Sequence, residues 1–168
     1  FINFREEVIT RRTAHELGKA RQRAHIMAGL AVAVENIDPV IELIRNAKDG
    51  DDARIKLIAR AWPARGIAPL IELIDDPAHQ VVDGEYQLSE EQAKAILDLR
   101  LQRLTGLERE KIAADLRELC DKITDYLAIL ADKALLYTIL RDELMEMRGQ
   151  FANDRRTSIE DSEFEQDI

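Results

Sequence analysis

The sequence predicts an all-α fold, an antiparallel coiled-coil arm of long helices that carries a small globular helical tip domain. Two long stretches, one at each end of the chain, have apolar residues at the three- and four-residue spacings of helices that pack along their length. Short apolar runs and helix-breaking residues fill the block between them. Charged residues make up 34% of the chain and aromatic residues only 5%, which is typical of long-helix proteins rather than of sheets.

The first stretch, residues 1–37, predicts the outgoing arm helix. At about 1.5 Å per residue this helix would span roughly 50 Å, far more than a small globular core requires. The stripe is rich in alanine, so we expect close packing against a second helix. Its members are Val8, Leu17, Ala20, Ala24, Met27, Ala31 and Val34.

The middle block, residues 38–106, predicts the globular tip. Asp38 and Pro39 are expected to start its first helix, as N-cap and first helical residue. Trp62 is expected to end a later helix and to anchor the core of the tip. The expected elements are helices at 40–47, 53–62 and 67–74 and short extended pieces at 81–82 and 86–88.

The tip ends in a helix that begins at a capping box formed by Ser89 and Gln92. This helix is expected to run on to Gly106, which ends it in a left-handed conformation. Ile96 and Leu99 lie off the main apolar stripe of the helix. In a chain this small and charged, a helix that is apolar on more than one side is expected to meet a partner subunit. The predicted dimer interface consists of Ile96, Leu99, Arg103, Leu104 and Leu107.

Residues 107–151 predict the returning arm helix. Its apolar positions alternate spacings of four and three, and the register shifts where Asp132 is placed to cap a new helix. We therefore expect a kink near 131–133, and we expect the two long legs to bury their apolar seams against each other. Residues 152–168 are expected to be an acidic, disordered tail. The returning seam consists of Ile112, Leu116, Leu119, Ile123, Tyr126, Leu130, Tyr137, Leu140, Leu144, Met147 and Phe151.

The sequence predicts no catalytic, cofactor-binding or metal-binding residue. His15 and His25 lie about 15 Å apart along the first helix, and His79 is distant in sequence, so all three are expected as surface or cap residues. Residues 49–52 have the composition of a calcium loop but lack the glutamate of its twelfth position. The single cysteine, Cys120, is expected to be a half-buried thiol, and it fits a reducing cytoplasm. No apolar run reaches the roughly 18–20 residues of a membrane span.

The net charge of −9 argues against a main DNA-binding surface, because phosphate contacts need clustered lysine and arginine. Residues 1–36 carry a net charge of +2, which leaves −11 for the remainder. A solvated helix face explains the basic residues of this segment. A weak DNA-facing role near the N-terminal end is the alternative.

Three blocks of the chain resemble one family. The run QAKAILDLRLQRLTGLEREK (residues 92–111) resembles the QAQAILDLRLxxLTGLExxK signature of DNA gyrase A subunits and of their paralogues, the topoisomerase IV A subunits. Residues 5–38 resemble the long helix that precedes the exit gate in these proteins, and FANDRRTSI (residues 151–159) resembles the segment that follows it. The blocks occur in family order, and general similarity favours gyrase over topoisomerase IV.

The resemblance implies the exit-gate (C-gate) dimerisation arm of an ATP-dependent type IIA DNA topoisomerase. Such an enzyme passes one DNA duplex through another, and gyrase introduces negative supercoils. The implied partners are a second copy through the tip, the transported duplex and the gyrase B subunit, with no membrane. Mg²⁺ and ATP are implied for the holoenzyme, bound outside this stretch. The family's DNA-cleaving tyrosine follows an arginine, and Tyr86, Tyr126 and Tyr137 do not match that context.

Two alternatives come from other classes of protein. A structural coiled-coil adaptor with no DNA role predicts unbroken exposed heptads outside the arm seam, and the sequence shows none. An autonomous enzyme needs a cluster of catalytic side chains, which the sequence also lacks. The chain begins in the middle of a helical pattern at Phe1, so we expect it to be a fragment of a longer protein.

Overall fold

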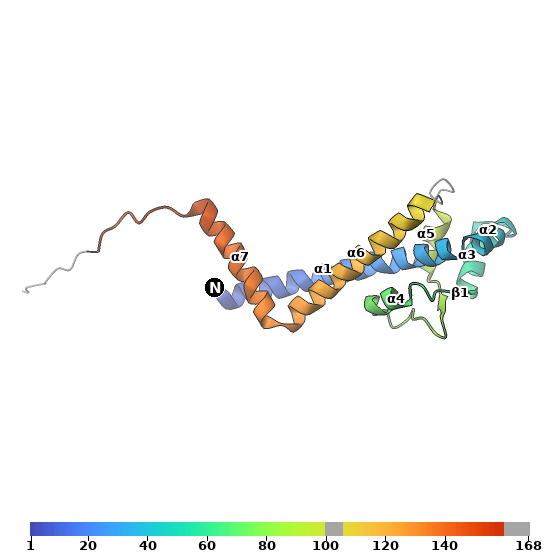
Figure 1. The fold of residues 1–168 in the computed structure, drawn as a ribbon, viewed down its shortest axis with the longest axis horizontal. Helices are drawn as coiled ribbons and strands as arrows, with labels where there is room; N and C mark the ends of the chain where they lie inside the picture. Colours follow the sequence, from blue (N-terminus) through green and yellow to red (C-terminus); the bar gives the residue numbers. More distant parts are fainter. Residues whose placement is uncertain (100–105, 160–168) are drawn as a thin grey trace, which may run out of the picture.

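The computed structural model describes residues 1–99 and 106–159, and this part of the chain is mostly helical (Figure 1). A long first helix and a small tip confirm the predicted all-α class. None of the helices in the described part is long and apolar enough to cross a membrane. The helices are α1 (Ile2–Glu35), α2 (Ile37–Arg45), α3 (Gly50–Ala59), α4 (Ala68–Ile74), α5 (Glu90–Leu97), α6 (Gly106–Ala131) and α7 (Lys133–Phe151), and the strands are β1 (Ala61–Pro63) and β2 (Glu85–Gln87).

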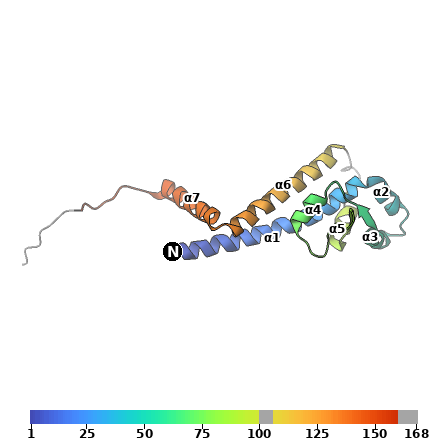
Figure 2. The same cartoon turned by 60° about the horizontal axis from the view of Figure 1, so that its bottom comes forward.

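The arm consists of α1 and α6, which run antiparallel and lie side by side in both views (Figures 1 and 2). Small side chains on α1, Ala24 and Ala28 among them, are fully buried in one cluster with Leu116 and Ile123 of α6. Alanine leaves room for a second helix to approach closely, and each buried leucine or isoleucine contributes about 1.5–3 kcal/mol. The alanine stripe of the sequence is therefore the packing surface of the arm.

Cys120 of α6 is buried rather than half-buried as predicted, with 1% of its surface exposed. Its Sγ atom lies 3.5 Å from the carbonyl oxygen of Leu70, because α4 covers α6 at this point. Burial raises the pKa of the thiol. Its role is packing.

The third helix is displaced from its predicted range of 53–62. Asp49 is its N-cap, and Oδ1 of Asp49 accepts a hydrogen bond from the backbone N–H of Asp52 at 2.8 Å, so α3 begins earlier. At the other end, Pro63 disfavours helical geometry at the residue before it. Trp62 is consequently in strand β1, and the prediction that it ends a helix is wrong.

Strands β1 and β2 pair antiparallel and place Trp62 opposite Tyr86. Both side chains are buried, and Nε1 of Trp62 donates to the carbonyl oxygen of Leu57 at 2.9 Å. Trp62 thus anchors the core of the tip as expected, although from a strand. The pairing joins segments more than twenty residues apart and closes the tip around its aromatic centre.

The junction of α1 and α2 is organised by Asn36, whereas Asp38 was predicted to be the cap. The amide of Asn36 donates to the carbonyl oxygens of Val32 (2.9 Å) and Pro63 (2.8 Å), so it closes α1 and holds β1 against it. Asp38 lies in the first turn of α2 instead. Its charge still complements the positive end of the helix dipole there.

Helix α5 ends at Leu97, short of the predicted continuous helix to Gly106. Its last turn tightens, with the N–H of Leu99 donating to the carbonyl oxygen of Ile96 at 3.2 Å. Gly106 is the first residue of α6 rather than the cap of α5. Residues 100–105 lie outside the described part of the chain.

Asp132 separates α6 from α7 and accepts a hydrogen bond from the N–H of Ala134 at 2.8 Å. Beyond it, α7 turns away from the direction of α6 and crosses the N-terminal half of α1 (Figure 1). There Leu136 and Leu140 bury Ile9 between the helices. The other predicted seam residues on α7 are exposed, because this helix departs from α1. They are Tyr137 (38%), Leu144 (40%), Met147 (50%) and Phe151 (69%).

Ion pairs fix the crossing of α7 on α1. Arg5 and Arg12 both pair with the carboxylate of Glu143, with Nη2 of Arg12 2.5 Å from Oε1. The hydrogen bond from Arg12 is the main cause that lowers the pKa of Glu143. A lowered pKa means that the carboxylate stabilises the fold above its ordinary pKa, and that this stabilisation is lost as the pH falls through the lowered value.

Glu143→Gln is expected to reduce the free energy of unfolding by about 0.5–1 kcal/mol at pH 7, since the pairs are partly exposed. The reduction should shrink as the pH falls below about 4.5, the ordinary value. Urea denaturation at pH 7 and at pH 4 measures both quantities. Glu146→Gln, an exposed change on the same helix, is the matched control. An equal loss at both pH values would contradict the ionic origin of the effect.

Candidate interaction surface at the tip

An apolar groove of about 340 Å³ lies at the far end of the arm. It is formed by the end of α1, by α2 and by the end of α5. All nine residues that line it are apolar, which is typical of a surface that binds another apolar surface. They are Ala33, Val34, Ile37, Val40, Ile41, Ile44, Ile96, Leu97 and Leu99.

The sequence of α2, IDPVIELIR, explains why this groove is exposed. The five aliphatic side chains of this nine-residue helix all lie on one side of it, and the polar residues lie on the other. Val40 is buried against the core, while Ile41 and Ile44 are only partly buried. The tip covers only part of this apolar side, so the part left uncovered lines the groove.

The structure places part of the predicted interface at this groove. Ile96 is 5% exposed and packs in the core, at the edge of the groove, and Leu99 is only partly buried within it. Leu107 lies in the first turn of α6. Arg103 and Leu104 lie outside the described residues. The interface as a whole stays a prediction, and Ile96 has little surface left to offer a partner.

The contribution of α2 was missed by reasoning from the sequence. The predicted interface named no residue of this helix, whereas Ile41 and Ile44 are only partly buried and line the groove. The density of aliphatic residues in so short a helix was the available signal.

A buried hydrogen-bond network holds α5 against α1 behind the groove. The predicted capping box of Ser89 and Gln92 is confirmed, with the N–H of Ser89 donating to Oε1 of Gln92 at 2.9 Å. Nε2 of Gln92 donates to the carbonyl oxygen of His25 (2.6 Å) and to the hydroxyl of Tyr86 (2.8 Å). A Cβ at Gly29 would lie 2.5 Å from Cγ of Gln92, so only glycine permits this approach.

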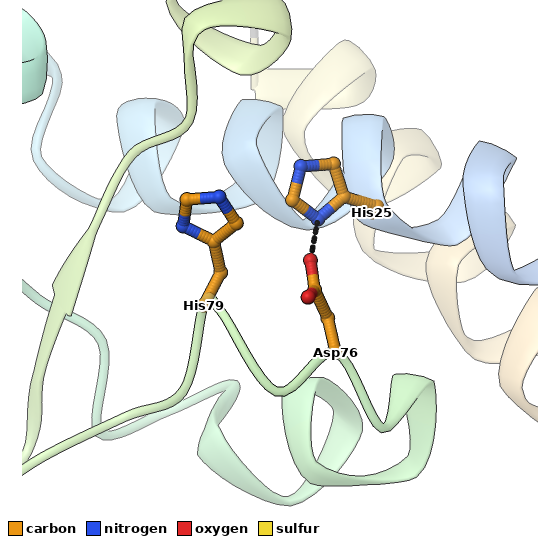
Figure 3. Close-up of side chains that lie close together, drawn as sticks. All are labelled: His25, Asp76 and His79. Atoms are coloured by element: carbon orange, nitrogen blue, oxygen red, sulfur yellow. Dashed lines mark ion pairs between the residues drawn. The ribbon is translucent and has the colours of Figure 1, made fainter.

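The structure also brings together residues that the sequence analysis treated as unrelated. His25 on α1 meets Asp76 and His79 from the loop after α4 (Figure 3). Nδ1 of His25 is 3.2 Å from Oδ2 of Asp76, and the two imidazole rings are 5.2 Å apart. Burial lowers the pKa of His25, although the Asp76 carboxylate opposes this shift. Contacts across about fifty residues leave no signal in local sequence.

A match to a family model identifies the chain. Residues 1–145 match the model of the DNA gyrase/topoisomerase IV A subunit. The chain belongs to this family. It is 49% identical, over its whole length, to the DNA gyrase A subunit of Rickettsia bellii and to that of Rickettsia conorii, and each match covers 19% of the relative. It is 48% identical to that of Granulibacter bethesdensis, over 99% of this chain and 18% of the relative.

The match confirms the resemblance seen in the sequence. The chain spans about a fifth of the length of these gyrase relatives.

The three tyrosines of this gyrase/topoisomerase IV family chain make hydrogen bonds or packing contacts within the fold. The hydroxyl of Tyr86 is buried in the network with Gln92, and burial raises its pKa, the opposite of what a nucleophile needs. The hydroxyl of Tyr137 donates to Glu6 of α1 at 2.9 Å. Tyr126 packs, partly buried, against the arm core.

Proposed function

We propose that this chain is the exit-gate (C-gate) dimerisation arm of a DNA gyrase A subunit. Residues 38–106 are then the gate domain, and residues 1–37 and 107–151 are the two legs that carry it. The observation that supports this proposal most strongly is the unpartnered apolar groove at the far tip of a long arm. A second copy of the chain offers the same groove, as a two-fold interface requires.

The proposed gate must hold two subunits together and still open to release a transported DNA duplex. A modest apolar patch with a polar rim suits both demands, because the rim is readily rehydrated. Leu99 lies between the apolar groove and polar side chains of this kind. Asp98, Lys111 and Asp115 line the surface hollow next to it. Opening then exposes a small apolar area and separates hydrated charges.

The full activity extends beyond this chain. We propose that the intact protein is the A subunit of an ATP-dependent type II topoisomerase that works with gyrase B in the cytoplasm. Mg²⁺, ATP and the DNA-cleaving tyrosine belong to parts of the holoenzyme outside this stretch. The role of the chain itself is mechanical: it closes the cavity below the cleaved DNA and gates release of the transported duplex.

The solution mass of the chain, measured by light scattering over a concentration series, tests the proposal. We expect twice the mass of 19.2 kDa, with dissociation only at low concentration. A monomer at every concentration would contradict self-association through the tip. Met147→Asp, on the exposed side of α7, is the control for a dimer formed elsewhere, and it should leave the mass unchanged.

A further inference from the structure

Three potential metal ligands converge on one side of the arm, away from the groove. His25 comes from α1, and Asp76 and His79 come from the loop that follows α4 (Figure 3). Each side chain offers one ligand atom, and these atoms all lie within 4.8 Å of one another. We propose that His25, Asp76 and His79 form a Zn²⁺ site with an open fourth coordination position.

The distances suit a tetrahedral ion. Zinc bonds of about 2.0–2.2 Å place neighbouring ligand atoms about 3.3–3.6 Å apart at the tetrahedral angle. The separation of 3.2 Å between Nδ1 of His25 and Oδ2 of Asp76 is already close to this value. His79 lies on a loop, so a small movement of its ring completes the triad. Two imidazoles and one carboxylate, with water in the fourth position, are a ligand set that zinc commonly takes.

A hydrogen bond on the far side of the ring orients His25. Nε2 of His25 is 2.8 Å from Oγ of Ser89, and that oxygen also accepts the N–H of Gln92 at 3.2 Å. When Nε2 carries the proton and donates a hydrogen bond to Oγ of Ser89, the lone pair of Nδ1 faces the Asp76 carboxylate. Two acceptors so close repel each other unless a cation lies between them. A zinc ion is such a cation.

The surroundings allow entry and favour a cation. The site opens into a hollow of about 610 Å³, whose lining includes the carboxylates of Glu90 and Glu91. Among the described residues that line the hollow, Arg21 is the one arginine or lysine, and it is paired with Asp75 at 3.2 Å. His25 precedes the groove residue Ala33 by eight positions, roughly 12 Å along α1. The metal would therefore cross-link α1 to the α4–β2 loop without contributing to the groove.

Isothermal titration calorimetry of the tag-free, metal-stripped full chain with ZnCl₂ tests this site. We expect one Zn²⁺ per chain and a rise in melting temperature on binding. His79→Ala and Asp76→Asn should each weaken binding by at least about 10-fold. His79 is on a loop, so its removal should leave the helical circular dichroism unchanged. His15→Ala, an exposed histidine on the same α1, is the matched control and should bind zinc as the parent chain does.

Co²⁺ as a substitute ion gives a second readout, since its visible absorption reports tetrahedral geometry. We expect tetrahedral bands that disappear in His79→Ala. Failure of the parent chain to bind Zn²⁺ would overturn the proposal and leave a hydrogen-bonded His–Asp pair only. Binding that His79→Ala and Asp76→Asn leave unchanged would overturn it equally.

Discussion

Leu99→Asp is expected to raise the dimer dissociation constant at least about 30-fold, equivalent to about 2 kcal/mol of association free energy. Leu99 is only partly buried in the single chain and lines the apolar groove, so part of its side chain is available to a partner. A two-fold interface presents the change twice, once from each copy of the chain. A carboxylate would then be desolvated on both sides of the gate.

Light scattering and far-ultraviolet circular dichroism together check this result. Helix content should stay nearly constant, because Leu99 follows the last turn of α5. Leu73→Asp is the matched control: it replaces an exposed leucine of α4, outside the groove, and should leave association intact. Dissociation in step with loss of helicity would make Leu99 a core residue, and an unchanged dissociation constant would remove it from the interface.

The sequence predicted features that depend on neighbouring residues. The capping box of Ser89 and Gln92 lies within four residues, and the alanine stripe of α1 repeats at helical spacing, so both could be inferred from local pattern. The position of Trp62 was also within reach, since Pro63 stands next to it. A proline restricts the residue before it as well, so the helix had to end ahead of Trp62.

Features that depend on distant contacts could not be predicted in this way. The meeting of His25 with Asp76 depends on how the loop after α4 returns to α1. The direction in which α7 leaves α6 likewise depends on the backbone at Asp132. A heptad pattern in the sequence does not specify which helix it packs against. Leu144 therefore continues the pattern in sequence but is exposed in this chain.

Gln92→Leu is expected to lower the free energy of unfolding by about 3 kcal/mol, the sum of two buried polar groups left without partners. Gln92 is fully buried, and its amide satisfies the N–H of Ser89 and the hydroxyl of Tyr86. Leucine is close in size, so the loss arises from hydrogen bonding rather than from a cavity. The expected fall in melting temperature is roughly 6–12 °C for a chain of this length.

Gln92→Glu separates the roles of the acceptor and the donor in this network. Glutamate has nearly the same shape and still accepts from Ser89, as many capping boxes do. It has no N–H to donate to Tyr86 and His25, and burial disfavours its charged form. The loss of stability should therefore be largest at neutral pH and should decrease as the pH falls and the carboxyl binds a proton. Thermal unfolding from pH 7 to pH 4 measures this trend, with Gln87→Leu, an exposed glutamine of β2, expected to stay within about 0.5 kcal/mol of the parent. A pH-independent loss in Gln92→Glu would mean that packing against Gly29, not hydrogen bonding, is what Gln92 contributes to the junction of arm and tip.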